Sequence, residues 1–445
     1  MARPESHSVA DEAALRRVID TRALAATAFN VTVGGGIFVL PAVVAASIGP
    51  SAPLAYVVCA IAMGLVVLCF AQAGSRVTLT GGPYAYVETA FGPFVGFLTG
   101  VLLWLMAILA TSAVSSAFAA SVATLWSPLG TSTGRALVLA AEYGLFAWLN
   151  VRGTKQGARL VEVVTIAKLV PLILFVIVGF ALARGPAPDV FGNVSAPALG
   201  RSVIVLIFAF AGIESALVPS GEVKDPARTV PRALGIAMVA VTLLYVAIQY
   251  VAQKILGASL ATEQAAPLVT AGRVIAGAAG ATFIAIGASI SMFGHGSGMT
   301  LATPRILYAF GRDGVLPKVF ARLNPRFHTP DVAIVVQCAI MFAVALTGTF
   351  ASLAVLADVS VLTLYLLCAL AAWQLVRKGV HEGGTPFRVP GGALVPWLAV
   401  AMIVWILSQA KLRELEVVAG TRAVAALVYL LRRGEIEARR VARLG

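Results

Sequence analysis

Residues 33–41 have the sequence VGGGIFVLP, in the middle of an apolar segment that is otherwise long enough to cross a membrane. The three glycines, Gly34 to Gly36, each cost roughly 1 kcal/mol relative to alanine inside a helix. A helix break at bilayer depth is tolerated where the freed backbone groups line a cavity or meet a ligand. The sequence therefore predicts a broken helix with a binding role. The alternative is a close helix crossing at small residues.

The composition of the chain requires a lipid environment. Of its 445 residues, 59% are hydrophobic and 12% are charged, whereas soluble domains are about 45–50% apolar and about 25% charged. Only helices and closed barrels satisfy their backbone groups in a bilayer, and the long apolar runs lack the alternation of barrel strands. We therefore predict an all-α polytopic membrane protein. Residues 1–21 are polar and are predicted to form a cytoplasmic tail, not a signal peptide.

Twelve apolar segments approach the length of roughly 20 residues that spans a bilayer. They lie at residues 22–46, 51–74, 91–122, 135–151, 160–183, 201–220, 232–257, 272–310, 331–348, 351–376, 393–410 and 412–431. The eighth is expected to include a cytoplasmic extension. Lys and Arg are concentrated in the loops on the N-terminal side of the membrane, so both termini are predicted to be cytoplasmic. This distribution explains the net charge of +13 without a nucleic-acid partner.

The sixth predicted span contains a second interruption. Residues 208–215 have the sequence FAFAGIES, and Pro219 follows. Gly35 and Gly212 thus each occupy the first helix of one five-helix half. Paired interruptions of this kind indicate an inverted-repeat transporter with its site near the bilayer midplane. The N-terminus of a half-helix attracts a carboxylate and its C-terminus attracts a cation, and an α-amino acid carries both groups.

Both interruptions resemble segments of the amino acid-polyamine-organocation superfamily, and three further stretches strengthen the resemblance. They are GEVKDP at residues 221–226, PRILYA at residues 304–309 and PFRVPGG at residues 386–392. The resemblance covers nearly the whole chain and implies secondary active transport of amino acids through a 5+5 inverted repeat. The expected parts are a transporter core at residues 22–376, with repeats at 22–183 and 201–376, a loop and helices eleven and twelve at 377–431, and a cytoplasmic tail at 432–445.

The resemblance places the substrate site at the two helix breaks. The expected binding residues are Val33, Gly34, Gly35, Gly36, Ile37, Phe208, Ala209, Phe210, Gly212 and Met299. Arginine/agmatine exchangers of the family carry tryptophan at the positions of Phe208 and Met299. This difference, together with a single acidic residue nearby, favours a neutral amino acid over a dication.

Ionisable side chains inside a membrane are functional hypotheses by default. Lys168, in the fifth predicted span, resembles the lysine with which some family members replace a sodium ion. Glu214 matches a family glutamate that is thought to link substrate and proton, and His295 lies on the eighth span. We predict that all three couple proton movement to transport. The alternatives are a snorkelling Lys168 and structural roles for Glu214 and His295, whereas Glu142 and Asp358 have no predicted partner.

No cofactor, metal site or enzymatic activity is expected. The four cysteines lie in apolar segments without metal-binding spacing, and no paired catalytic carboxylates or nucleotide-binding loop occur. The expected partners are an amino acid, protons and the lipid bilayer of the plasma membrane. No disulfide-linked subunit is expected, because the outer loop at residues 124–134 lacks cysteine. The leading hypothesis is proton-coupled symport of neutral amino acids by alternating access; the alternatives are an amino acid/amine exchanger and a cationic amino acid permease.

Overall fold

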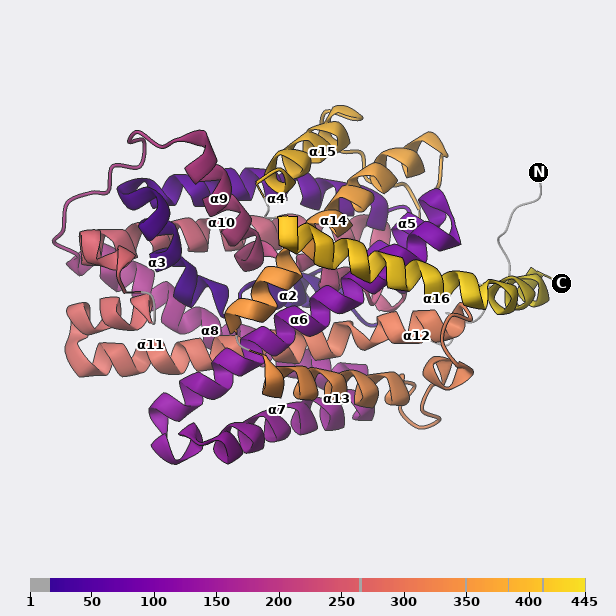
Figure 1. Ribbon diagram of the computed structural model, residues 1–445, viewed down its shortest axis with the longest axis horizontal. Helices are drawn as coiled ribbons and strands as arrows, with labels where there is room; N and C mark the ends of the chain where they lie inside the picture. Colours follow the sequence, from indigo (N-terminus) through magenta and orange to yellow (C-terminus); the bar gives the residue numbers. More distant parts are fainter. Residues whose placement is uncertain (1–16, 264–265, 349, 383, 410–411, 445) are drawn as a thin grey trace.

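The protein is a bundle of helices, described by a computed structural model for residues 17–263, 266–348, 350–382, 384–409 and 412–444 (Figure 1). The α-helices are α2 (Thr21–Thr32), α3 (Gly36–Ile48), α4 (Ala52–Gly74), α5 (Pro83–Phe91), α6 (Pro93–Leu125), α7 (Ser132–Arg152), α8 (Thr154–Leu182), α9 (Ala196–Phe210), α10 (Pro226–Leu256), α11 (Pro267–Ala302), α12 (Pro304–Arg312), α13 (Asp331–Thr347), α14 (Phe350–Arg377), α15 (Leu394–Leu407) and α16 (Leu412–Leu444). Short 3-10 helices connect several of them, including η3 (Ile213–Leu217) and η4 (Ser220–Glu222).

Seven helical segments of the described chain are long and apolar enough to cross a membrane, and two shorter apolar helices, α13 and α15, accompany them. The seven are Gly36–Gly74, Pro93–Ala123, Gln156–Leu182, Ala196–Leu217, Pro226–Ala261, Pro267–Arg312 and Ser360–Arg377. An all-α polytopic membrane protein is therefore confirmed. The number of twelve spans and the inverted repeat stay predictions.

The first and sixth predicted spans are both discontinuous. α2 ends at Thr32 and α3 begins at Gly36, so the triple glycine separates two helices. α9 ends at Phe210, and the chain continues through Gly212 into η3. The sequence located both breaks, because glycine and a nearby proline disfavour a continuous helix: three glycines mark the first break and Gly212 marks the second.

The eighth predicted span, residues 272–310, is not one straight helix. α11 is interrupted by non-helical backbone at Ala276 and Gly277, and its two arms fold against each other (Figure 1). A Cβ atom at Gly272 would lie 2.8 Å from the carbonyl oxygen of Gly280, so only glycine permits this approach. The first arm therefore does not continue the span of the second. The prediction missed the hairpin because both arms are equally apolar.

Three other boundaries differ from the prediction. α5 lies between the second and third predicted spans, where the sequence analysis placed no helix. α12 is separated from α11 by Thr303, at the place where an extension was expected. α16 continues past residue 431 to Leu444, through the segment that was expected to be a tail. Amphipathic segments such as these are not detected by a search for apolar runs.

The end of the bundle that carries α12 is held together by the segment before α2. The backbone N–H groups of Val18 and Ile19 donate to the carbonyl oxygen of Glu222 at 2.9 and 3.0 Å, and Ile19 bridges Val223. The Glu222 carboxylate also pairs with the Arg305 guanidinium of α12 at 3.2 Å, and both side chains are buried. Removal of either partner of a buried ion pair destabilises the fold, because the remaining charge stays in a medium of low dielectric constant.

We expect Arg305→Leu to destabilise the protein by about 3–5 kcal/mol, because it leaves the Glu222 carboxylate buried without its counter-ion. The measurement is the apparent melting temperature of the purified protein in detergent. The double variant Glu222→Leu with Arg305→Leu is the control, since it removes both charges and should recover most of the loss. Equal melting temperatures for the single variant and the parent would contradict the importance of this ion pair.

Candidate functional site

The break between α2 and α3 exposes backbone groups that a continuous helix would pair. Val33 leaves the helical conformation, with φ −79° and ψ 86°, and Gly35 precedes the first residue of α3. A Cβ atom at Gly34 would lie 3.1 Å from His295 Nδ1, so a larger residue there would press on the His295 ring. The carbonyl groups at the end of α2 have no helical partner and require others.

Lys168 and Ser291 supply partners for these carbonyl groups. Lys168 Nζ donates to the carbonyl oxygens of Asn30 at 2.7 Å and Val33 at 2.5 Å. Ser291 Oγ lies 3.1 Å from the carbonyl oxygens of both Val33 and Gly34. Lys168 is fully buried, and no acid of the described chain forms an ion pair with it. Its ammonium group thus occupies a position at which backbone oxygens would hold a small cation.

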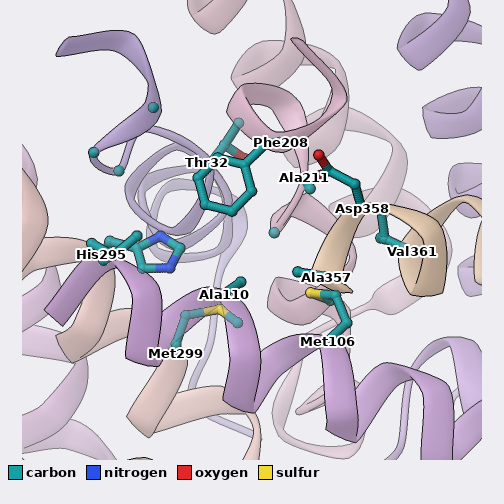
Figure 2. A pocket seen from close by; sticks show the side chains of 15 residues that line it. Thr32, Met106, Ala110, Phe208, Ala211, His295, Met299, Ala357, Asp358 and Val361 are labelled. Carbon is teal, nitrogen blue, oxygen red and sulfur yellow. The ribbon is translucent and has the colours of Figure 1, made fainter. Parts of the chain in front are cut away.

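His295 contacts the same break from α11. Its Nδ1 lies 2.6 Å from the carbonyl oxygen of Val31, and since a carbonyl only accepts, Nδ1 carries the proton. The second ring nitrogen, Nε2, is buried and has no hydrogen-bond partner within the described residues. Figure 2 shows the ring at the edge of a cavity. His295 therefore presents an unpaired polar atom to this cavity.

The break after α9 is closed by its own acidic side chain. Gly212 has a φ of +106°, and a Cβ atom there would lie 2.6 Å from the carbonyl oxygen of Val31, so the two breaks touch at this glycine. The Glu214 carboxylate accepts from the Gly212 N–H at 3.0 and 3.1 Å. It also accepts from the Tyr365 hydroxyl at 2.8 Å. The Gly212 N–H, directly before η3, is thus already occupied by a carboxylate.

Tyr245 of α10 connects the two breaks. Its hydroxyl lies 3.2 Å from the carbonyl oxygen of Thr32 and 3.0 Å from that of Ala209. Its ring packs edge-on against Phe210, with the centroids 5.2 Å apart. One side chain therefore holds the end of α2 against the end of α9.

A small cavity lies between the breaks, α6, α11 and α14 (Figure 2). Among the predicted binding and coupling residues, those that line it are Gly34, Gly35, Gly36, Phe208, Gly212, His295 and Met299. Its free volume is about 20 Å³, which is room for little more than water. A larger ligand would require the walls to move apart.

The other predicted residues surround the cavity without lining it. Val33 and Ala209 contribute carbonyl oxygens to Lys168 and Tyr245, and Ile37 and Phe210 are buried in the core. Lys168 and Glu214 lie behind the two breaks, as described above. Of the two phenylalanines that were expected to bind the substrate, Phe208 lines the cavity, whereas Phe210 packs against Tyr245.

The sequence analysis missed several residues of the site. The further lining residues are Thr32, Met106, Ala110, Val114, Ala211, Ala357, Asp358 and Val361. Tyr245, Ser291 and Tyr365 hold the breaks from outside the cavity. Each of these three is a polar side chain within an apolar span, as Lys168 is. This feature of the sequence indicates a functional residue in all four cases. The apolar lining residues carry no such signal.

The two acids without a predicted partner occupy different places. Asp358 lines the cavity from α14, opposite His295 in Figure 2. Glu142 of α7 lies outside the cavity and accepts from the Ser115 hydroxyl at 3.2 Å. Tyr143 in turn donates to Ser115 at 3.0 Å. Asp358 is therefore placed to contact a ligand in this cavity, whereas Glu142 belongs to a hydrogen-bonded group between α6 and α7.

A larger cavity of about 670 Å³ follows the small one along the same helices. We call it the outer cavity. α6 lines the small cavity with residues 106–114 and the outer cavity with residues 116–121. The first break and the first residue of α3 line the small cavity with residues 34–36, and α3 lines the outer cavity with residues 38–39. Met292 of α11 lies at the boundary between the two cavities. Its Cγ is 3.6 Å from the position that a Cβ atom on Gly35 would take. The Met292 side chain thus separates the two cavities.

An apolar helical bundle whose broken helices meet at an internal cavity defines the chain as a multi-pass membrane transporter. The sequence matches the amino acid permease family over residues 19–413, and the chain belongs to this family. The resemblance to the amino acid-polyamine-organocation superfamily is thereby confirmed. The family and the relatives described next are transporters and not enzymes.

Three relatives illustrate the similarity. The serine/threonine exchanger SteT of Bacillus subtilis is 28% identical over 394 residues, which cover 86% of this chain and 88% of that protein. The branched-chain amino acid permease BcaP of Lactococcus lactis is 28% identical over 428 residues, covering 89% and 91%. The methylthioribose transporter of Bacillus subtilis is 26% identical over 409 residues, covering 88% of each chain.

We expect Tyr245→Phe to destabilise the protein by about 1–3 kcal/mol, because the carbonyl groups of Thr32 and Ala209 lose a buried donor. The apparent melting temperature in detergent measures this effect. Tyr250→Phe on the same helix is the control, since the Tyr250 ring stacks on Phe180 and keeps that contact as phenylalanine. A parent-like melting temperature for Tyr245→Phe would show that the hydroxyl does not hold the breaks together.

Proposed function

We propose that the protein is a proton-coupled symporter of neutral amino acids that works by alternating access. The observation that carries this proposal is the contact of the Lys168 ammonium with the carbonyl oxygens of Asn30 and Val33. Loss of the proton from Lys168 would remove the charge that holds these carbonyl groups. Proton release would thereby change the geometry of the first break. Relatives at 28% identity that are named for serine, threonine and branched-chain amino acids support a neutral substrate.

The proposed substrate position follows from the polarity of the helix ends. The carboxylate binds the first free N–H groups of α3, at Gly36 and Ile37, because the Gly212 N–H at the second break already donates to Glu214. The α-ammonium group faces the C-terminal end of α9, which carries partial negative charge. His295 Nε2 is available as an acceptor, and the substrate side chain contacts Phe208 and Met299.

The orientation in the membrane is part of the proposal. Ile19 contacts η4, the Arg305 side chain joins η4 to α12, and Arg432 of α16 donates to the carbonyl oxygen of Val315 at 2.7 Å. Both ends of the described chain thus lie at the α12 end of the bundle. We place this end in the cytoplasm of a cell whose plasma membrane holds the protein, because Lys and Arg are concentrated there. The substrate then enters through the outer cavity and passes Met292.

Asp358 favours a second candidate function. Its carboxylate lines the cavity and would attract the side chain of a cationic amino acid. A third possibility is exchange of one amino acid for another without a proton, as the name of the SteT relative indicates for that protein. These candidates differ in substrate charge and in their response to a proton gradient.

Uptake of radiolabelled amino acids into proteoliposomes tests the proposal. The purified chain should accumulate a neutral amino acid against its gradient when an inward proton gradient is imposed, and collapse of the gradient by an ionophore should stop accumulation. Uptake of lysine or arginine alone would favour the cationic permease. Uptake that depends on an internal amino acid and ignores the proton gradient would favour the exchanger. No uptake of any amino acid would contradict amino acid transport itself.

We expect Lys168→Ala to abolish proton-driven accumulation while substrate binding persists at reduced affinity. Burial disfavours the charged ammonium, whereas the carbonyl groups favour it. Movement of the first break lengthens the carbonyl contacts, so the ammonium can then release its proton. Lys168→Arg should fail as well, because the guanidinium stays charged. Uptake at equal protein density is the measurement, with Lys254→Ala of α10 as the matched lysine control. Parent-like accumulation by Lys168→Ala would make Lys168 a structural residue.

A further inference from the structure

A second group of basic side chains lies far from the two breaks. A cavity of about 430 Å³ is lined by the end of α4, the end of α14 and the start of α15. Three of its lining residues are arginines from separate segments, Arg76, Arg377 and Arg388, and no acid lines it within the described chain. We call this the basic cavity. Like charges repel, so their convergence without an acid indicates a place for an anion.

Arg76 is the buried member of this group. Its side chain is 8% exposed, and its Nη1 donates to the carbonyl oxygen of Val380 at 3.0 Å. Its Nε is buried and has no partner among the described residues. Burial and the positive charge of Arg388 lower the pKa of the Arg76 guanidinium from its ordinary value. A buried charge without a counter-ion is unfavourable, and an anion in the cavity would remove that penalty.

The surroundings of the basic cavity are apolar and face outward. The Arg377 guanidinium lies over the Trp373 ring, 4.7 Å from its centroid, and Trp373 packs edge-on against Trp397 at 5.5 Å. On the adjacent α15, the exposed fractions are 62% for Leu394, 48% for Trp397 and 45% for Leu398. Tryptophan is enriched where the membrane meets water. The basic cavity therefore lies at the level of lipid headgroups, next to a surface suited to acyl chains.

We propose that the basic cavity binds the headgroup of an anionic phospholipid. The phosphate is received by the guanidinium groups of Arg76, Arg377 and Arg388, and the acyl chains lie on the exposed apolar side chains of α15. Guanidinium groups bind phosphate through paired hydrogen bonds, and basic pockets between membrane helices bind anionic headgroups. A free phosphate ion would satisfy the arginines but leave the apolar face of α15 uncovered. This site is independent of the transported substrate.

Native mass spectrometry of the full chain tests this proposal. The purified protein in neutral detergent is titrated with phosphatidylglycerol and, separately, with phosphatidylcholine. We expect one phosphatidylglycerol to bind each chain in preference to phosphatidylcholine. Arg388→Gln should weaken its apparent affinity about tenfold, because it removes one charge-assisted contact with the phosphate. Arg388 is exposed, so this variant is expected to fold. The apparent affinity of Arg76→Gln for phosphatidylglycerol is the second measurement, and it should fall as well.

The control is Arg232→Gln, which removes an exposed positive charge of α10 from outside the basic cavity and should leave the affinity unchanged. Equal affinities for Arg388→Gln and Arg232→Gln would overturn the site, as would equal binding of the two lipids by the parent. Inorganic phosphate is added as a competitor at millimolar concentration. Displacement of the lipid by phosphate at equal affinity would overturn a lipid as the occupant.

Discussion

The carbonyl groups at the end of α2 need hydrogen-bond donors, and this need organises the helices around the first break. A break in a membrane helix leaves backbone groups without partners in a medium that supplies no water. Lys168, Ser291, His295 and Tyr245 meet this need from α8, α11 and α10. These side chains hold the broken helix in place, so α8, α10 and α11 are all fastened to one short segment of backbone. The site is therefore built from the same contacts that stabilise the fold.

The two breaks are chemically unequal. The Glu214 carboxylate accepts from the backbone N–H of Gly212 at the second break, and the Tyr365 hydroxyl holds it there. The N-terminus of α3 has no comparable carboxylate among the described residues. The first break thus offers free N–H groups at a helix start, whereas the second break already holds a carboxylate. The proposed orientation of the substrate rests on this difference.

The cavities and the ion pair give the two ends of the bundle different properties. At the α12 end, Glu222 and Arg305 form a buried ion pair beside the segment before α2. At the other end, the outer cavity reaches Met292, one side chain from the small cavity. An ion pair in a low-dielectric medium separates only at a substantial free-energy cost, whereas a methionine side chain changes rotamer easily. A buried ion pair thus joins the elements at the α12 end, whereas one flexible side chain lies between the two cavities at the other end.

The membrane environment, the helical class, the family and the positions of both breaks can be read from the amino-acid sequence. These follow from local properties: apolar runs of spanning length, clustered glycines and short ordered motifs. The tertiary structure alone decided that Lys168 meets Asn30 and Val33, that Tyr245 joins Thr32 to Ala209, and that Asp358 faces the cavity. It also decided the fold of α11 into a hairpin. These contacts join residues far apart in sequence or depend on one close backbone approach. The hydrophobic pattern of a sequence does not predict which residues of different helices lie close together.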